Sequence, residues 1–207
     1  FFTFLMAIIG REKCIFLLCD VQTKFASLIS SMDSVIHVGE TFNRLSQIMD
    51  IPLVVTEQYP KGLGHTVDGI KLSENPRASI FEKTSFSMLS EQVRAHIVKE
   101  TTYADFSQLH FVLFGIEAHV CVLQTAIDLR QRYNAQVHLA ADGTSSRHTF
   151  ERKLAFQHMR SAGVHISSAE SIAFQLLERS DSPYFKEAQK LFIGDRPDTG
   201  LDRLIEH

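Results

Sequence analysis

The chain has 207 residues, a formal net charge of −3, 44% hydrophobic residues and 22% charged residues. This length predicts one domain with a sizeable core, and the slightly acidic balance excludes the extended basic surface that most nucleic-acid binders need. The three cysteines, Cys14, Cys19 and Cys121, have no paired spacing. This sparse, odd count argues against a disulfide framework or a structural zinc site and favours a reducing compartment.

The N-terminal residues 1–9 are apolar apart from Thr3 and are too few to cross a bilayer. They lack the basic and cleavage regions of a secretory signal. We expect an N-terminal extension over 1–13, in which 1–5 are either native or a cloning remnant, with Met6 as the natural start in the second case. No other segment approaches a transmembrane span. The expected location is intracellular, in the cytoplasm or, as the alternative, the mitochondrion.

Short apolar segments alternate along the chain with segments of helical periodicity. The expected strands are 14–20, 52–57, 78–84, 110–115, 135–142 and 164–167. The expected helices are 37–50, 88–100, 118–132, 148–163, 169–180 and 184–192, with Ser90 as an N-cap and Asn134 and Gly163 as C-terminal stops. Strands that are apolar throughout and separated by helices indicate an α/β fold with a parallel sheet covered on both faces.

Residues capable of chemistry fall where the expected strands end. Asp20 ends the first strand, Lys83 lies near the end of the third, and Asp142 ends the fifth, while Cys121 follows the fourth. Ligands of parallel sheets bind beyond the carboxyl ends of the strands, so these residues are expected at one edge. A carboxylate can take the thiol proton, and an ammonium or a helix start favours the thiolate. Backbone N–H groups at that helix start can bind an oxyanion.

Each of these residues also has a structural interpretation. Cys121 on the apolar side of a helix could be an inert buried thiol, and Asp20 could cap a turn. Lys83 could be a surface lysine, and for Asp142 the role of a turn cap is favoured. His119 precedes Cys121 by two positions, and such neighbours on a helix face different sides, so a Cys–His pair is not favoured. The residues alone thus predict an α/β domain with a candidate Cys–Asp–Lys edge.

Three ordered motifs resemble the isochorismatase-like cysteine hydrolases: FLLCDVQ at the first strand end, EKTSFSML around the third, and GIEAHVCVLQTAIDL after the fourth. The stretches VVTEQYPKGLG, DGTSSR and PYFKEAQKL are similar to the eukaryotic isochorismatase domain-containing proteins within that family. The resemblance covers residues 14–195. It implies an α/β, three-layer, doubly wound domain with a six-stranded, mostly parallel sheet and helices on both faces, followed by a C-terminal tail over 196–207.

The resemblance also implies a catalytic triad. Its members map onto Cys121 as the nucleophile, Asp20 as the general base and Lys83 in support. The family further has a cis peptide bond that would fall at Ile116–Glu117, where it would direct the backbone N–H groups of Glu117 and Cys121 toward an oxyanion.

Two departures from family members limit the chemistry. The metal-binding Asp-x-His that nicotinamidases of the family carry after the second strand is absent, and His65 stands alone there. We therefore expect no metal and no cofactor, and nicotinamidase activity is not expected. Isochorismatases that cleave a vinyl ether lack the nucleophilic cysteine, so Cys121 argues against that reaction too.

Four residues near strand ends are candidate substrate contacts: Gln22, Phe25, Tyr59 and Phe86. The aromatic ones could line a small apolar pocket or pack in the ordinary way, and Gln22 could orient substrate or bond to backbone. The turn-rich stretch 58–69 is expected to be a surface loop that could overhang the site.

Functions of different classes remain open. The favoured one is a metal-independent cysteine hydrolase of a small amide-like or related C–N substrate. The alternative is a non-catalytic or weakly catalytic oligomeric binding or scaffold protein. Hydrolysis of nucleic acid is a further possibility, which the charge balance does not support. The expected partners are a small-molecule substrate and further copies of the chain, with residues 169–192 as a candidate interface, and neither nucleic acid nor membrane.

Overall fold

The computed structural model describes residues 9–201, so parts of the expected N-terminal extension and C-terminal tail lie outside the described residues. Its centre is a six-stranded sheet with the order β3-β2-β1-β4-β5-β6. All five neighbouring pairs are parallel, so the predicted fold class is confirmed and the sheet is parallel throughout. The strands are β1 Cys14–Cys19, β2 Leu53–Gln58, β3 Ala78–Lys83, β4 His110–Gly115, β5 Gln136–Thr144 and β6 His165–Ser167.

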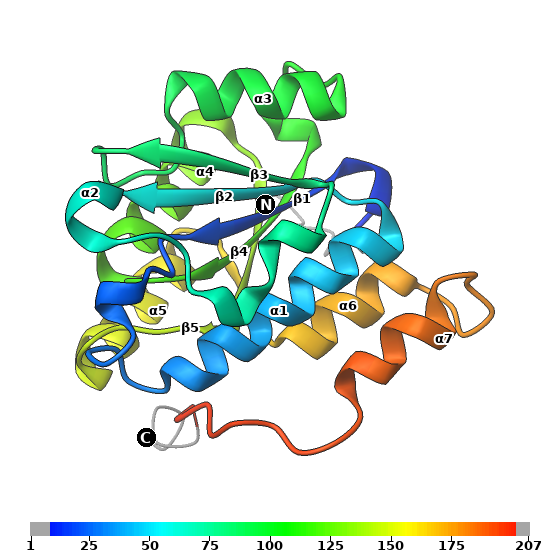
Figure 1. Cartoon of the computed structure of the whole chain (residues 1–207). Coiled ribbons are helices and arrows are strands. Elements are labelled where there is room, and N and C mark those ends of the chain that lie inside the picture. Colours follow the sequence, from blue (N-terminus) through cyan, green and yellow to red (C-terminus); the bar gives the residue numbers. More distant parts are fainter. Residues whose placement is uncertain (1–8, 202–207) are drawn as a thin grey trace.

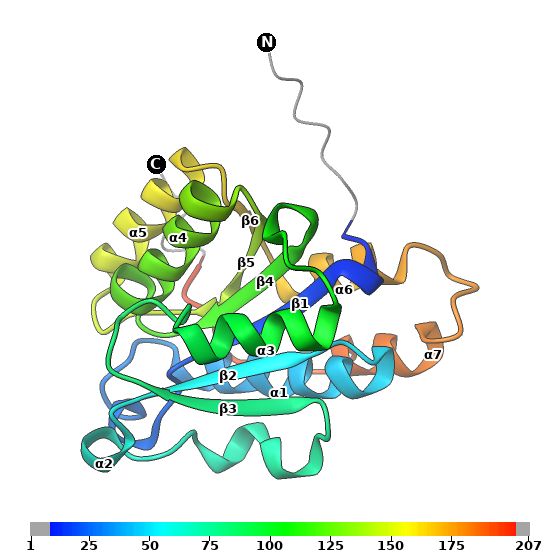
Figure 2. The ribbon, with the colours of Figure 1, turned by 90° about the horizontal axis from the view of Figure 1, so that it is seen from above.

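Helices cover both faces of this sheet (Figure 1; Figure 2). On one face lie α1 Met32–Met49, α6 Ala169–Leu177 and the short α7 Phe185–Ala188. On the other face lie α3 Glu91–Thr101, α4 Leu123–Tyr133 and α5 Thr149–Ser161. Because both of its faces are covered, every residue of β1 is buried, which explains why the segment CIFLLC is apolar without alternation.

Several element boundaries differ from those expected. Helix α1 begins at Met32 rather than at 37, because its first turn carries polar residues that hide the apolar period. The helix expected over 118–132 starts as a π-helical turn, Ala118–Val122, before α4. The helix expected over 184–192 divides into α7 and a 3-10 turn, Gln189–Phe192. The stretch 58–69, expected to be a loop, contains the short helix α2 Pro60–Leu63.

The predicted helix ends agree with the structure. Ser90 Oγ accepts a hydrogen bond from the backbone N–H of Val93 at 3.3 Å, which is the geometry of an N-cap. Asn134 ends α4 with a φ of 49°, and Gly163 follows α5 with a φ of 85°. Both residues are of the types that adopt the left-handed conformation at least cost, so the chain can leave each helix there.

The strand order creates a switch point between β1 and β4. The chain runs outward from β1 to β2 and β3, returns to place β4 beside β1, and then continues outward to β5 and β6. Diverging connections of this kind leave a crevice at the carboxyl ends of the two central strands. Asp20 directly follows β1, and Cys121 lies in the π-helical turn after β4, so both flank this crevice.

Three histidines stack across the opposite, amino end of the sheet. The ring centroids of His110 and His138 are 5.4 Å apart, and those of His138 and His165 are 5.1 Å apart. Burial, together with the two neighbouring histidines, lowers the pKa of His138 to about 3. Burial also lowers the pKa of His110 and of His165. The stack is therefore neutral in the folded protein near neutral pH.

We expect this stack to make the protein sensitive to acid. A histidine of the unfolded chain has a pKa near 6.5, so below about pH 6.5 the unfolded state binds more protons than the folded state. For His138 this stability is fully present above that pH and is lost toward about pH 3, by about 1.4 kcal/mol per pH unit. Urea unfolding of the wild type and of His138→Gln at pH values across this range measures the effect.

The variant should lose less stability than the wild type between about pH 6.5 and pH 4.5. His158→Gln is the control, because His158 lies exposed on α5 outside the stack, and it should keep the wild-type pH dependence. Equal acid sensitivity in the wild type and His138→Gln would contradict the assignment of the effect to the stack.

Candidate active site

Asp20, Lys83 and Cys121 lie together at the carboxyl edge of the sheet. Lys83 Nζ is 2.7 Å from Asp20 Oδ2, and Cys121 Sγ lies within 4.8 Å of an Asp20 carboxylate oxygen. All three residues are buried: Asp20 is 2% exposed, Lys83 5% and Cys121 8%. The cysteine is therefore the one that solvent reaches most easily. The fold thus brings together residues from three strand ends that are far apart in the sequence.

The Lys83 ammonium is held by acceptors on several sides. Besides Asp20, its Nζ donates to Gln58 Oε1 at 2.7 Å and to the carbonyls of Ser85 and Phe86 at 3.1 and 3.0 Å. Burial alone would lower the pKa of Lys83, but the ionisable groups of Cys19, Asp20 and Cys121 outweigh it, and the pKa lies above its usual value. Lys83 therefore carries a permanent positive charge beside the carboxylate. It is buried, and so differs from the surface lysine that was the alternative interpretation.

The Asp20 carboxylate is fixed on both oxygens. Thr56 Oγ1 donates to Oδ1 at 2.7 Å, while Lys83 occupies Oδ2. Asp20 itself has a φ of 50°, which turns the chain out of β1 directly after Cys19. Thr56 was not predicted as a site residue, since it belongs to the apolar strand β2, and the sequence assigned no definite role to Gln58 at the end of the same strand. Their contacts follow from the register that pairs Thr56 with Cys19 and Gln58 with Lys83.

Cys121 lies within the π-helical turn that follows β4. Thr125 Oγ1 donates to the Cys121 carbonyl at 2.7 Å and accepts from the backbone N–H of Met88 at 3.0 Å. The peptide bond between Ile116 and Glu117 is cis, at the position that the family resemblance implied. π-Helical turns occur frequently at functional sites, because they shift a backbone group out of the regular helix pattern.

His119, although close in sequence, does not pair with the cysteine. Its Nδ1 lies 3.0 Å from Ser146 Oγ, which engages the ring. Asp142 is also separate from the triad, because its Oδ1 accepts from the backbone N–H of Ala169 at 2.8 Å and so caps α6. Asp142 thus has a structural role, as favoured, but its carboxylate caps a helix and not the predicted turn over 143–148.

The predicted substrate contacts divide into buried and exposed residues. Gln22 is 0% exposed, and its amide donates to the Gln58 carbonyl at 3.0 Å and accepts from the Gln58 N–H at 2.8 Å, which favours its backbone-bonding role. Phe25 is partly buried and packs against the α1–α6 side of the core. Tyr59 and Phe86, by contrast, are 57% and 51% exposed, so both remain available to a ligand.

Tyr59 lines a hollow next to the triad. The hollow has a volume of about 540 Å³, and its lining also includes Lys83, the segment 84–85 after β3 and residues 90–92 at the start of α3. This places an exposed aromatic ring and the triad lysine on one cavity wall. Among the four predicted contacts, the structure thus places Tyr59 in a cavity that Lys83 also lines.

The segment that carries Tyr59 is tied to the sheet through Glu57. One carboxylate oxygen of Glu57 accepts from the backbone N–H and the hydroxyl of Thr66 at 2.7 and 2.8 Å, and the other lies 2.8 Å from His65 Nδ1. Burial would raise the pKa of Glu57, but these hydrogen bonds lower it below its usual value. His65 is therefore engaged by Glu57, and residues 58–66 form an anchored wall instead of a free loop.

One group of ligand-type atoms includes the sulfur of Cys121. The thiol sulfurs of Cys19 and Cys121 and a carboxylate oxygen of Asp20 lie within 4.8 Å of one another. Two sulfurs and an oxygen suit a thiophilic ion such as Zn²⁺. The Lys83 ammonium, however, occupies Asp20 Oδ2 at 2.7 Å and places a positive charge beside that position. The residues present therefore fit a metal poorly.

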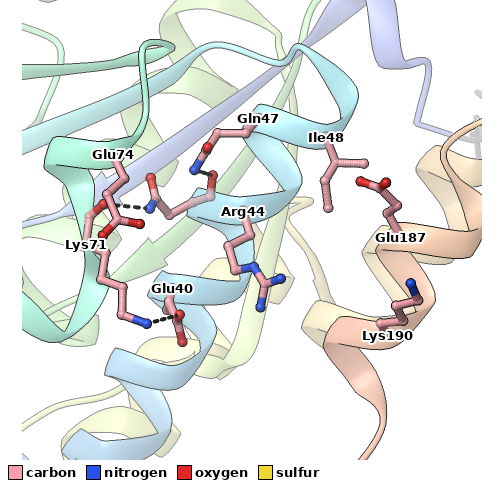
Figure 3. A pocket seen from close by; sticks show the side chains of 9 residues that line it. Glu40, Arg44, Gln47, Ile48, Lys71, Glu74, Glu187 and Lys190 are labelled. Carbon is pink, nitrogen blue, oxygen red and sulfur yellow. Dashed lines mark hydrogen bonds and ion pairs between the residues drawn. The ribbon is translucent and has the colours of Figure 1, made fainter.

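A separate hollow of about 580 Å³ lies between α1, the segment 71–74 and α7 (Figure 3). Its charged lining residues are balanced, with three acids and three bases: Glu40, Glu74, Glu187, Arg44, Lys71 and Lys190. Lys71 Nζ and Glu40 Oε1 form an ion pair at 2.9 Å. The hollow contains no member of the triad and no buried unpaired charge, so the triad edge remains the candidate site.

An all-parallel α/β domain with these residues at its switch point has the fold of the isochorismatase-type hydrolases. The isochorismatase domain model matches residues 14–171, and the chain belongs to the isochorismatase family. It is 39% identical to isochorismatase domain-containing protein 2 of Danio rerio over 204 residues, covering 95% of this chain and 96% of that protein.

Two further similarities bear on the function. Isochorismatase domain-containing protein 1 of Salmo salar is 37% identical over 187 residues, which is 90% of this chain but only 63% of that protein, so the chain spans less than two thirds of this relative. A solved structure described as MAR1 ribonuclease from Caenorhabditis elegans is 40% identical, with a TM-score of 0.84, and the match covers 94% of this chain and 97% of that one. Within residues 9–201, no helix has the length and apolar character needed to span a membrane.

Proposed function

We propose that the protein is a cysteine hydrolase of small amide-like substrates, in which Cys121 is the nucleophile, Asp20 the general base and Lys83 the residue that holds the base. The observation that supports this best is the distance set at the switch point. Cys121 Sγ lies within 4.8 Å of the Asp20 carboxylate, and Lys83 Nζ lies 2.7 Å from that carboxylate. Apart from the substrate and a water molecule, the proposed steps use protein groups only.

In the first step Asp20 takes the thiol proton, and Cys121 Sγ attacks the carbonyl carbon. The nearby ammonium of Lys83 balances the negative charge that moves from Asp20 to the sulfur as the bond forms. The tetrahedral oxyanion is bound by the backbone N–H of Glu117, in the segment that joins β4 to the π-helical turn, and by that of Cys121, within the turn. Collapse of this intermediate expels the amine, which receives the proton that Asp20 holds, and leaves an acyl-thioester on Cys121.

In the second step Asp20 removes a proton from water, and the resulting hydroxide attacks the thioester. The C–S bond of the thioester then breaks, the departing sulfur of Cys121 takes back the proton that Asp20 holds, and the carboxylic acid returns to solution. Lys83 stays charged throughout, because its acceptors and its pKa above the usual value oppose loss of a proton. Its role is therefore to orient Asp20 and to balance the negative charge that moves between Asp20 and Cys121.

A panel of small amides, ureas and related C–N compounds tests this function. Cys121→Ala should lose hydrolysis of any substrate found by at least about a thousand-fold, since the covalent route needs the sulfur. Asp20→Asn should lose about a hundred- to ten-thousand-fold. Asp142→Asn is the matched control: it is another buried carboxyl at a strand end, its amide oxygen can still accept from Ala169, and activity should be unchanged. Turnover that survives in Cys121→Ala would reject the mechanism.

Thiol labelling tests the nucleophile without a known substrate. Iodoacetamide should modify Cys121 near neutral pH faster than it modifies a free cysteine derivative, although Cys121 is only 8% exposed. The same reaction should slow in Asp20→Asn and keep its rate in Asp142→Asn. Labelling of Cys121 no faster than that of Cys14 would contradict an activated thiol.

RNA cleavage is the second candidate function, because the C. elegans structure of 40% identity carries the name ribonuclease. The formal net charge of −3 gives this chain no general attraction to RNA. Purified protein incubated with unstructured RNA decides the point. Cleavage that Cys121→Ala lacks would assign RNA to the same triad, whereas equal cleavage by the variant would indicate another site or a contaminant.

Assembly into homo-oligomers remains a prediction.

A further inference from the structure

A second thiol lies beside the proposed nucleophile. Cys19 is the last residue of β1, and its sulfur lies within 4.8 Å of Cys121 Sγ. Both side chains belong to the apolar layer between the sheet and the helices α3, α4 and α5. Cys19 has no role in the proposed hydrolysis, since it is 0% exposed and neither holds the base nor reaches solvent.

We infer that Cys19 and Cys121 form a reversible disulfide when the protein meets a peroxide, and that this bond is a built-in protection of the nucleophile. The bond itself follows from the proximity of two thiols. Its consequence, a reversible loss of hydrolysis, rests on the proposed function. The reactant that oxidises Cys121 is a small peroxide, either hydrogen peroxide or an alkyl hydroperoxide.

Exposure sets the order of the steps. Cys121 is 8% exposed and Cys19 is 0% exposed, so peroxide meets Cys121 first. The Cys121 thiolate attacks one peroxide oxygen, the O–O bond breaks, and the products are a sulfenic acid on Cys121 and hydroxide, which takes a proton to become water. The sulfur of Cys19 then attacks Sγ of the sulfenic acid. The S–O bond breaks, the hydroxyl leaves with the Cys19 proton as water, and the disulfide remains.

The electrostatics agree with this order. Burial, and then the neighbouring Cys121 and Asp20, raise the pKa of Cys19 well above its ordinary value. Cys19 therefore stays a thiol in the resting protein and does not compete for the peroxide. It acts only on a sulfenic acid formed next to it, whose departing hydroxyl can accept its proton.

The geometry requires only a local movement. A disulfide needs sulfur atoms about 2.0 Å apart, so rotation of the two side chains must close part of a gap that is 4.8 Å at most. Cys14 cannot take either role. It lies at the other end of β1, about 16 Å along the strand at a rise of about 3.3 Å per residue. Its side chain also packs in the layer of α1 and α6, on the opposite face of the sheet.

The presence of Cys19 thereby changes the final product of the oxidation of Cys121 by peroxide. A sulfenic acid without a neighbouring thiol is oxidised further to a sulfinic acid, which ordinary thiols do not reduce. The disulfide, by contrast, is reduced by dithiothreitol. The two fates differ in mass and in reversibility, so they can be separated without a known substrate.

The test uses the whole chain, treated with hydrogen peroxide and followed by intact mass, peptide mapping and iodoacetamide labelling of Cys121. The wild type should lose the mass of two hydrogen atoms, yield a linked peptide that contains Cys19 and Cys121, lose labelling, and regain it fully with dithiothreitol. Cys19→Ala should gain the mass of a sulfinic acid on Cys121 and recover little labelling. Cys14→Ala, a matched removal of a buried thiol from the same strand, should behave as the wild type.

Several results would overturn the inference. One is sulfinic acid on Cys121 of the wild type without the linked peptide, and others are a link to Cys14 or a link between two chains on a non-reducing gel. Cys19→Ser provides a second variant should Cys19→Ala fold poorly, and it should also fail to recover. If the linked peptide forms but the reduced protein hydrolyses nothing, the proposed function fails and the disulfide stands. If the reduced protein is active and no link forms, the disulfide fails and the function stands.

Discussion

Lys83→Met should destabilise the protein by about 3–5 kcal/mol, which is the usual cost of leaving one partner of a buried ion pair alone. Asp20 is 2% exposed, and after the change only Thr56 would still donate to its carboxylate. The carbonyls of Ser85 and Phe86 would lose their donor as well. Urea unfolding near neutral pH measures the effect, and the free energy of unfolding is the quantity to compare.

A double-mutant cycle makes this test specific. Asp20→Asn together with Lys83→Met removes both charges, so the double variant should recover part of the stability that Lys83→Met alone loses. Lys71→Met is the matched control. Lys71 forms an ion pair of similar length with Glu40, 2.9 Å against 2.7 Å, but its side chain is 55% exposed, so the expected loss is only about 0–1 kcal/mol. Equal losses in Lys71→Met and Lys83→Met would contradict a buried pair.

Gly115→Ala should be similarly damaging, at about 4 kcal/mol or more, because two costs combine at this position. Gly115 ends β4 with a φ of 119°, a conformation that side chains rarely allow. An added Cβ would also lie 2.2 Å from the carbonyl oxygen and 2.8 Å from the nitrogen of Cys19. Both are backbone atoms of the central strand, so neither can move without disturbing Asp20.

Substitutions at two other glycines distinguish the cost of the backbone conformation from the cost of the steric contact. Gly194 has a φ of 109° but no atom within 4 Å of an added Cβ, so Gly194→Ala measures the backbone cost alone, about 1–3 kcal/mol. Gly10 has neither constraint, with a φ of −73°, and Gly10→Ala should be nearly neutral. Thermal or urea unfolding of the three variants should rank Gly115→Ala as the least stable. A loss in Gly115→Ala no larger than in Gly194→Ala would show that β1 and β4 are not in close contact there.

The parts of the fold that depend on neighbours in sequence could be predicted. The strand positions follow from short apolar runs such as 14–19, because burial on both faces removes any polar alternation. The ends at Ser90 and Asn134 follow from side chains that satisfy or tolerate local backbone geometry. Boundaries failed where local composition conceals the packing, as in the polar first turn of α1, in which Ser34 is buried by donating to the Asp142 carbonyl.

The candidate site divides in the same way. Asp20, Lys83 and Cys121 could be identified because strand ends and motifs are visible in a single sequence, and parallel strands carry their ends to one edge. Thr56 could not be identified and Gln58 could not be given a definite role, because their contacts depend on the register between strands, which pairs residues many positions apart. Gln22 was a candidate for substrate binding, and its bonds to Gln58 depend on that same packing.

The sequence by itself determined the class of fold, the alternation of strands and helices, and the identity of the three residues proposed for catalysis. Only the tertiary structure decided which groups surround them. The pairing of β4 with β1 brings Cys121 within 4.8 Å of Cys19 and Asp20, although about a hundred residues separate them along the chain. The physical reason is that apolar periodicity is a local property, whereas the order and register of strands are selected by packing of the whole core.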